Sequence, residues 1–277
     1  MSFLTKEENL KKILKITFII YAALGLINAL FFFNLELDGV GERWIVEFGN
    51  GGFLGSINPM TLIMSFAIIA IVLLFAKGVK FERIPGRKQS LVEMLFEYFW
   101  EIVEDTVPVK KYRKITFVIS MSLFIYITLS NILGGIPGVD VIPLKDGLSV
   151  SLFTNPWYSP TSDLNVNLTY AILVLILSHA LAINHKGIGG WLKSFIQPVP
   201  FLLPLNIISE IAKPISHSLR LFGNIMGGGI LVLIISYMLK YFVIPVFLWG
   251  FFGWFVGFIQ AFVFALLTIA YIGSVLE

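Results

Sequence analysis

The stretch "SHSLRLFGNIMGGG", residues 216–229, sets an arginine inside a long apolar segment and follows it with small residues. Arg220 lies where water should be scarce, and a centrally placed Arg or Lys in a membrane helix costs from about 3 to more than 10 kcal/mol, depending on how it is measured. A chain that keeps such a charge must place it against protein or water. The stretch therefore predicts a membrane helix with one side that does not face lipid.

The composition fits a membrane protein. The chain is 57% hydrophobic and 13% charged, contains 26 Phe, and has a mean hydropathy of +0.88, which excludes an ordinary soluble domain. Its continuous apolar runs approach the roughly 20 residues of a membrane helix, whereas outer-membrane strands are shorter and alternate in polarity. The absence of cysteine excludes disulfides and thiolate metal sites. A net charge of +3 is too small to indicate a nucleic-acid partner.

The apolar runs predict an all-α membrane protein with about six membrane helices in a single integral membrane domain, residues 1–277. The expected spans are 14–33, 59–78, 115–134, 168–185, 200–239 and 244–275. Four lysines lie before or at the start of the first span, and nine basic residues lie from Lys77 to Lys114. The positive-inside rule then predicts that both termini lie in the cytoplasm. We expect a multi-pass protein of a bacterial inner membrane. A basic, apolar N-terminus also fits a signal peptide, but we interpret 14–33 as a helix.

Two further segments extend this interpretation. Residues 91–107, "LVEMLFEYFWEIVEDTV", place four glutamates on one helical face, which predicts a cytoplasmic interfacial helix whose acidic face meets solvent or a partner. Residues 201–239 as one helix would be roughly 58 Å long at about 1.5 Å per residue, nearly twice the membrane thickness. Together with 244–275 they predict a long, tilted C-terminal hairpin within 200–277, preceded by helices within 59–199.

Polar residues form a stripe along the first arm of this hairpin. Their steps of three and four residues place them on one helical face: Glu210, Lys213, His217, Arg220 and Asn224. Glu210 and Lys213 can neutralise each other, but Arg220 has no acid within one helical turn. Its counter-charge must come from another helix or another subunit. The glycines at 223, 227–229, 250, 253 and 257 allow either close helix packing or room for water.

Several segments resemble, in order, subunit a of F-type ATP synthases, the stator that faces the rotating c-ring. They are "PGRKQSLVEMLFEY" (85–98), "NILGGIPG" (131–138), "SPTSDLNVNLTYAI" (159–172), "PFLLPLNIISEIAKP" (200–214), "KPISHSLRLFGNI" (213–225) and "IQAFVFALLTIAYI" (259–272). The resemblance covers about 59–275 and leaves 14–33 without an assigned role. It implies a noncatalytic subunit without cofactor, metal site or catalytic residues, whose partners are the c-ring, peripheral-stalk subunit b, the lipid bilayer and a transported cation.

The resemblance also implies a role for Arg220 in ion translocation. A c-ring carboxylate carrying H⁺ or Na⁺ is neutral enough to rotate through lipid, and a fixed guanidinium in a low-dielectric setting lowers its pKa, so the cation leaves. The same charge repels cations that would pass directly between two aqueous half-channels. Ion passage is thereby coupled to rotation and ATP synthesis.

Further site residues follow from the same resemblance. Asn224 and Gln260 fall near the arginine, and Gln260 would position it by hydrogen bonding. Glu210 corresponds to an acid near the access path, His217 would line water, and Asp163 would stand at a channel mouth or simply at a helix N-terminus. Proton-driven relatives commonly carry ionisable relay groups at two positions that are Gly229 and Gly253 here. We interpret the two glycines as favouring Na⁺ over H⁺.

Three other functions remain to be weighed. A secondary ion transporter would also carry charge at mid-membrane, but the hydropathy contains no inverted repeat. An intramembrane serine hydrolase would need a separate base, and adjacent side chains such as Ser216 and His217 point about 100° apart on a helix. A purely structural assembly subunit would tolerate loss of Arg220.

Overall fold

The computed structural model describes residues 46–47, 56–57, 59–78, 82, 86–144, 147–156, 158–197, 199–239 and 244–277. Its helices are α2 (Pro59–Gly78), α3 (Arg87–Thr106), α4 (Lys110–Gly134), α5 (Leu164–Ile196), α6 (Leu203–Leu239), α7 (Ile244–Gly250) and α8 (Gly257–Leu276). A π-helical segment, Phe251–Val256, joins α7 to α8. Short 3-10 turns precede α5 at Pro160–Ser162 and α6 at Pro200–Leu202.

The helical membrane fold is confirmed. Within the described residues, four helical segments are long and apolar enough to cross a bilayer: Pro59–Gly78, Lys110–Gly134, Leu164–Ile196 and Phe247–Leu276. The predicted span 59–78 coincides with α2. The expected first helix, 14–33, and the turn of the hairpin at 240–243 lie outside the described residues.

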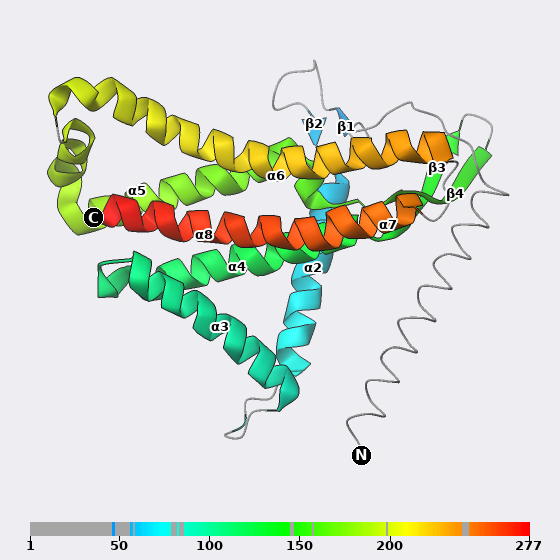
Figure 1. Ribbon diagram of the computed structural model, residues 1–277, viewed down its shortest axis with the longest axis horizontal. Helices are drawn as coiled ribbons and strands as arrows, with labels where there is room; N and C mark the ends of the chain where they lie inside the picture. Colours follow the sequence, from blue (N-terminus) through cyan, green and yellow to red (C-terminus); the bar gives the residue numbers. More distant parts are fainter. Residues whose placement is uncertain are drawn as a thin grey trace.

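Four long helices run beside one another while α2 crosses them steeply (Figure 1). These four are α4, α5, α6 and α8. Because α2 has 20 residues, its length of about 30 Å matches the hydrocarbon thickness. With 37 residues, α6 is about 55 Å long and cannot also lie along the membrane normal. The hairpin is therefore steeply inclined, as the length of its arms predicts.

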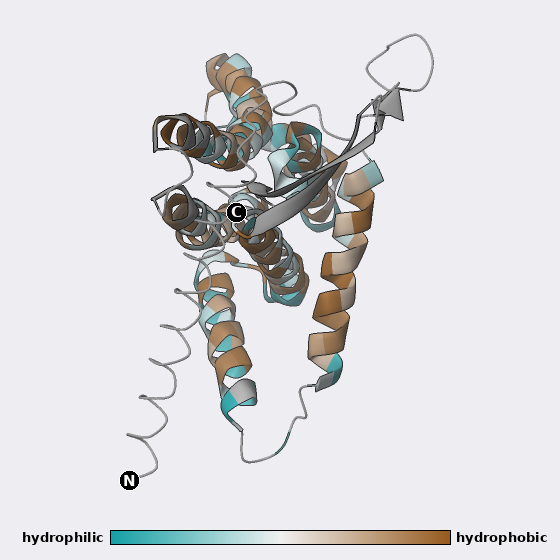
Figure 2. Ribbon diagram, turned by 90° about the vertical axis from the view of Figure 1, so that its right-hand side faces the viewer, coloured by the Kyte–Doolittle hydropathy of each residue, from teal (hydrophilic) through white to brown (hydrophobic). Residues whose placement is uncertain are grey.

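Helix α3 packs one side against the bundle and leaves the other free. Phe99 and Val103 are fully buried, and the Phe99 ring centroid lies 4.9 Å from that of Phe124 in α4. All four glutamates of the predicted acidic face are exposed: Glu93, Glu97, Glu101 and Glu104. Figure 2 shows hydrophobic residues around all of α2, whereas α3 alternates between hydrophilic and hydrophobic sides. The amphipathic pattern of 91–107 is thus a true helical face.

Two antiparallel ribbons interrupt the helical order, and the sequence did not predict them. One pairs β1 (Val46–Glu47) with β2 (Ser56–Ile57). The other pairs β3 (Pro137–Leu144) with β4 (Gly147–Pro156) in the long connection between α4 and α5. Figure 1 shows β3 and β4 beside α7, at the end of the bundle away from the C-terminus.

Buried polar side chains join the end of α4 to the start of α5 and to α8. Asn131 Nδ2 donates to the Gly257 carbonyl at 2.8 Å, and Thr161 Oγ1 donates to Asn131 Oδ1 at 2.7 Å. Asn167 Nδ2 donates to the Thr161 carbonyl at 2.7 Å, and the Ser159 hydroxyl donates to the Ser130 carbonyl at 2.8 Å. We call Ser130, Asn131, Ser159, Thr161 and Asn167 the polar junction. It fixes the inclined α8 against two neighbouring helices.

Candidate functional site

The polar stripe of α6 divides into three environments along the helix. Glu210 and Lys213 are half-buried between α5 and α8, and His217 is buried against α8. Arg220 is exposed, and Asn224 is half-buried. The structure therefore places the predicted residues along one helix but does not gather them into one compact cluster.

Arg220 stands on the open side of α6. It makes no ion pair or hydrogen bond with any residue that the structure describes. Glu210, the acid preceding it on α6, lies ten residues earlier, or about 15 Å along the axis. Its own helix supplies no acid within one turn, and the described part of the chain supplies none from another helix. A counter-charge from another subunit stays a prediction.

The side of α6 that carries Arg220 is lined with small residues. Ala212, Ser216, Gly223 and Gly227 are exposed and recur with Arg220 at steps of four and three residues. A Cβ added at Gly223 or Gly227 would meet nothing within 4 Å. A Cβ at Gly228, in contrast, would lie 2.9 Å from the Phe252 ring. Of these glycines, Gly228 serves internal packing, whereas Gly223 and Gly227 leave room for an external surface beside Arg220.

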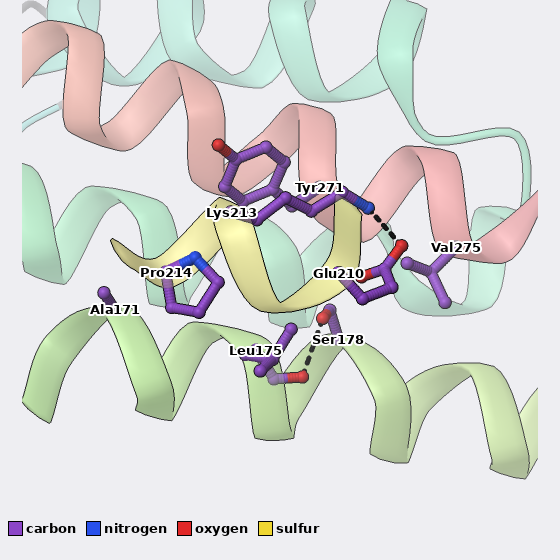
Figure 3. A pocket seen from close by; sticks show the side chains of 8 residues that line it. All are labelled: Ala171, Leu175, Ser178, Glu210, Lys213, Pro214, Tyr271 and Val275. Atoms are coloured by element: carbon purple, nitrogen blue, oxygen red, sulfur yellow. Dashed lines mark hydrogen bonds and ion pairs between the residues drawn. The ribbon is translucent and has the colours of Figure 1, made fainter. Parts of the chain in front are cut away.

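Glu210 and Lys213 form an ion pair at a small pocket between α5, α6 and α8 (Figure 3). The pocket is lined by Ala171, Leu175, Ser178, Glu210, Lys213, Pro214, Tyr271 and Val275. Lys213 Nζ binds Glu210 Oε1 and also lies 5.6 Å from the centroid of the Tyr271 ring. Glu210, paired with Lys213, therefore lies in a largely apolar pocket. The pocket is at the end of the bundle where the C-terminus lies (Figure 1).

His217 lies between this pocket and Arg220. Its ring stacks on Phe264 with centroids 3.7 Å apart, and its Nε2 lies 3.2 Å from the Phe264 carbonyl oxygen. The side chain is 2% exposed, while its buried Nδ1 has no hydrogen-bond partner among the described residues. The ring packs against Phe264 of α8, and that it lines water stays a prediction.

Asn224 and Gln260 are both half-buried, one on α6 and one on α8. Neither side chain is hydrogen-bonded to Arg220, since Arg220 has no such partner in the described part of the chain. Positioning of the arginine by Gln260 therefore stays a prediction for the assembled complex.

Asp163 stands at the far end of α5 as a helix N-cap. Its carboxylate accepts a hydrogen bond from the Asn165 amide at 2.9 Å, the arrangement that satisfies a free N–H group in the first turn. The neighbouring Asn167 is fully buried in the polar junction. Its Oδ1 has no hydrogen-bond partner among the described residues. A channel mouth at Asp163 stays a prediction, and capping already accounts for the residue.

The two glycines at the relay positions differ. A Cβ at Gly229 would meet nothing within 4 Å, and the residue is exposed. A Cβ at Gly253 would lie 2.3 Å from the Cα of Gly135 and 2.6 Å from its amide nitrogen. Close packing of the π-helical segment on the end of α4 therefore explains Gly253 without reference to an ion, and only Gly229 leaves open space.

Sequence reasoning missed the aromatic surroundings of Glu210. His179 Nε2 lies 3.4 Å from Glu210 Oε2, and Trp191 Nε1 donates to His179 Nδ1 at 3.1 Å. The sequence carries only a glycine at 187, after which α5 changes direction, and a glycine by itself does not reveal these contacts.

Fold and site together define a polytopic helical membrane protein. On the exposed side of its inclined α6 it carries an arginine that has no ion-pair partner among the described residues. The family model for the ATP synthase A chain matches residues 59–273. Among curated proteins, ATP synthase subunit a of Moorella thermoacetica is 35% identical over 225 residues, covering 80% of this chain and 93% of that protein. Subunit a of Desulforamulus reducens is 34% identical over 229 residues, covering 79% and 80%. Subunit a of Acidothermus cellulolyticus is 33% identical over 215 residues, covering 76% and 73%.

The chain therefore belongs to the ATP synthase A chain family, as the resemblance of its motifs predicted. Members of this family are membrane subunits of ATP synthase and are not themselves catalytic. The matched region begins at α2 and ends within α8. Residues 14–33 fall outside it.

Proposed function

We propose that this chain is the stator subunit that couples cation passage to rotation of a c-ring, and that Arg220 performs the coupling. One observation carries the proposal: Arg220 is exposed on α6 and has no counter-charge among the described residues. A buried or lipid-facing guanidinium without a partner costs several kcal/mol. A carboxylate on a neighbouring subunit would remove that cost.

The shape of this side of α6 suits a moving partner. Large apolar side chains such as Ile215 and Leu219 are 47% and 49% exposed, and the small residues of α6 lie beside Arg220 on the adjoining face. Such a surface allows the backbone of another helix to approach closely without specific interlocking contacts. A c-ring carboxylate can then pass the guanidinium, release its cation there and move on.

Access to Arg220 would come from two sides of the membrane. On one side, we assign a half-channel to the pocket at Glu210 and Lys213 and to His217, which follow one another along α6 towards Arg220. On the other side, we assign the opposite half-channel to the region of Asn224, Gln260 and Asp163. The fixed positive charge between the two would prevent direct leakage of cations.

The transported ion is Na⁺ or H⁺, and we infer Na⁺. The inference now rests on Gly229 alone, where open space replaces an ionisable relay group, because packing explains Gly253. A hydrated Na⁺ benefits from space without a titrating side chain. We also propose that the chain contacts peripheral-stalk subunit b. It would lie in a bacterial inner membrane with both termini in the cytoplasm.

ATP-driven pumping by the complete complex tests the proposed function. Arg220→Gln keeps a planar, hydrogen-bonding group but removes the charge, and we expect pumping into reconstituted vesicles to cease while the complex still assembles. Arg113→Gln is the matched control, because Arg113 pairs with Glu104 at 3.3 Å on the rim of the bundle. Undiminished pumping by the Arg220 variant would overturn the proposal.

A further inference from the structure

The C-terminal part of α5 folds back because of one backbone conformation. Gly187 has φ 73° and ψ 165°, a combination essentially restricted to glycine, and it interrupts the helix. A Cβ there would meet nothing within 4 Å, so conformation and not space requires the glycine. The turn brings Trp191 and Phe195 onto His179, with ring centroids 5.8 Å and 6.0 Å from the imidazole.

The contact between Trp191 and His179 fixes the position of a proton. An indole Nε1 only donates hydrogen bonds, so His179 Nδ1, at 3.1 Å, must accept. A neutral imidazole that accepts at Nδ1 carries its proton on Nε2.

The protonated Nε2 lies near the oxygen of Glu210 that Lys213 does not bind. His179 Nε2 lies 3.4 Å from Glu210 Oε2, while Oε1 is bound by Lys213. Within the described residues Oε2 is buried without a close hydrogen-bond partner, since 3.4 Å exceeds the usual N–H···O range. The charged and titratable groups around the carboxylate are His179 from α5, Lys213 from α6 and Tyr271 from α8.

We propose that His179, oriented by Trp191, is a positioning residue for Glu210. It holds Oε2 towards α5 and the pocket, so that Lys213 neutralises only one side of the carboxylate and the other side receives the incoming cation or its hydration water. The inference rests on the proposed function, in which this pocket is one of the two access paths. Through His179, the segment after Gly187 that carries Trp191 and Phe195 would then control how readily the cation enters the pocket.

Three variants of the complete, reconstituted complex separate this role from simple packing. His179→Phe keeps the aromatic stack but removes the donor, and His179→Gln restores a donor without the ring. Trp191→Phe keeps the ring contacts but removes the indole N–H. ATP-driven uptake is measured with radioactive sodium, and in parallel by a pH-sensitive dye, over a range of Na⁺ concentration and pH. His185→Phe is the control, because His185 is exposed on the same helix and lies against Tyr112.

We expect His179→Phe to raise the half-saturating cation concentration by about threefold to tenfold, because Glu210 Oε2 loses its polar neighbour on α5, with a smaller change in maximal rate. His179→Gln should recover part of the loss, and Trp191→Phe should show a weaker form of it. In a Glu210→Asp background the shorter side chain already withdraws the carboxylate from His179. His179→Phe should then cause no further rise in the half-saturating cation concentration. Such non-additivity is the signature of two residues that act as a unit.

Additive effects of His179→Phe and Glu210→Asp would overturn the inference, as would wild-type half-saturation in Trp191→Phe. If His179→Phe prevents assembly, the same comparison made with Trp191→Phe decides. Pumping that survives Arg220→Gln would instead refute the proposed function, so the two failures are distinguishable.

Discussion

Gly253 and Gly135 bring the π-helical segment ahead of α8 into backbone contact with the end of α4, because a Cβ on Gly253 would lie 2.3 Å from the Cα of Gly135. Trp254 continues this contact by donating its indole N–H to the Ile132 carbonyl at 3.2 Å. Real Cβ atoms do not approach backbone so closely, and backbone cannot swing aside as a flexible side chain does. The second arm of the hairpin is therefore fixed in place at this crossing.

Gly253→Ala should destabilise the subunit by about 1–3 kcal/mol or more through overpacking. The apparent melting temperature of the purified complex should fall. Gly229→Ala is the matched control, because a Cβ there meets nothing within 4 Å, and we expect a change within about 0.5 kcal/mol. Equal behaviour of the two variants would show that the close approach is not rigid.

Gly187→Ala should destabilise the fold by backbone strain alone, by about 1–3 kcal/mol. The position has open space around its missing Cβ but a φ of 73°. Gly189→Ala, in the following helical turn and equally open, should instead be neutral or stabilise by up to about 1 kcal/mol. Limited proteolysis across 187–196 measures the difference, and faster cleavage of the Gly189 variant would contradict the prediction.

Asn131→Leu should disrupt the polar junction. The Gly257 carbonyl loses its side-chain donor and the Thr161 hydroxyl loses its acceptor, at about 1–3 kcal/mol for each buried group left unpaired. We expect reduced yield of assembled complex and a lower melting temperature. Asn165→Leu, on the exposed side of the same region, serves as the control and should assemble normally. Normal assembly of both variants would show that the junction contributes little.

ATP hydrolysis by the purified, coupled complex should be stimulated by Na⁺ if Gly229 marks a sodium-conducting path. The stimulation should be greatest at alkaline pH, where protons compete least for the ring carboxylate. An equal rate of hydrolysis in a sodium-free buffer and after addition of Na⁺ would refute the choice of Na⁺ and leave H⁺ as the coupling ion.

The sequence predicted the elements whose formation depends on hydrophobic length. The 59–78 run has the bounds of α2, and the length of the 200–239 run by itself requires an inclined helix. Amphipathic spacing likewise predicted the exposed glutamates of α3. These features depend on composition and period, which are local properties of a sequence.

Contacts between distant segments could not be predicted in this way. Gly253 was interpreted as a missing relay group, although its requirement arises from Gly135, which is distant in the chain. Trp191 reaches His179 only because Gly187 adopts a positive φ, and a glycine in a sequence does not reveal its φ. The β3–β4 ribbon was not predicted, although Leu148, Val150 and Leu152 alternate with serines in β4.

The central claim is that Arg220 makes ion passage depend on rotation, and the ratio of ATP formed to ions passed tests it most directly. Vesicles that contain the complete complex are given an imposed ion gradient, and both quantities are measured for wild type, Arg220→Lys and Arg220→Gln. The account predicts that Arg220→Gln passes ions without forming ATP and that Lys, a compact charge without the planar guanidinium, restores only part of the ratio. A wild-type ratio in the Arg220→Gln complex would contradict the account.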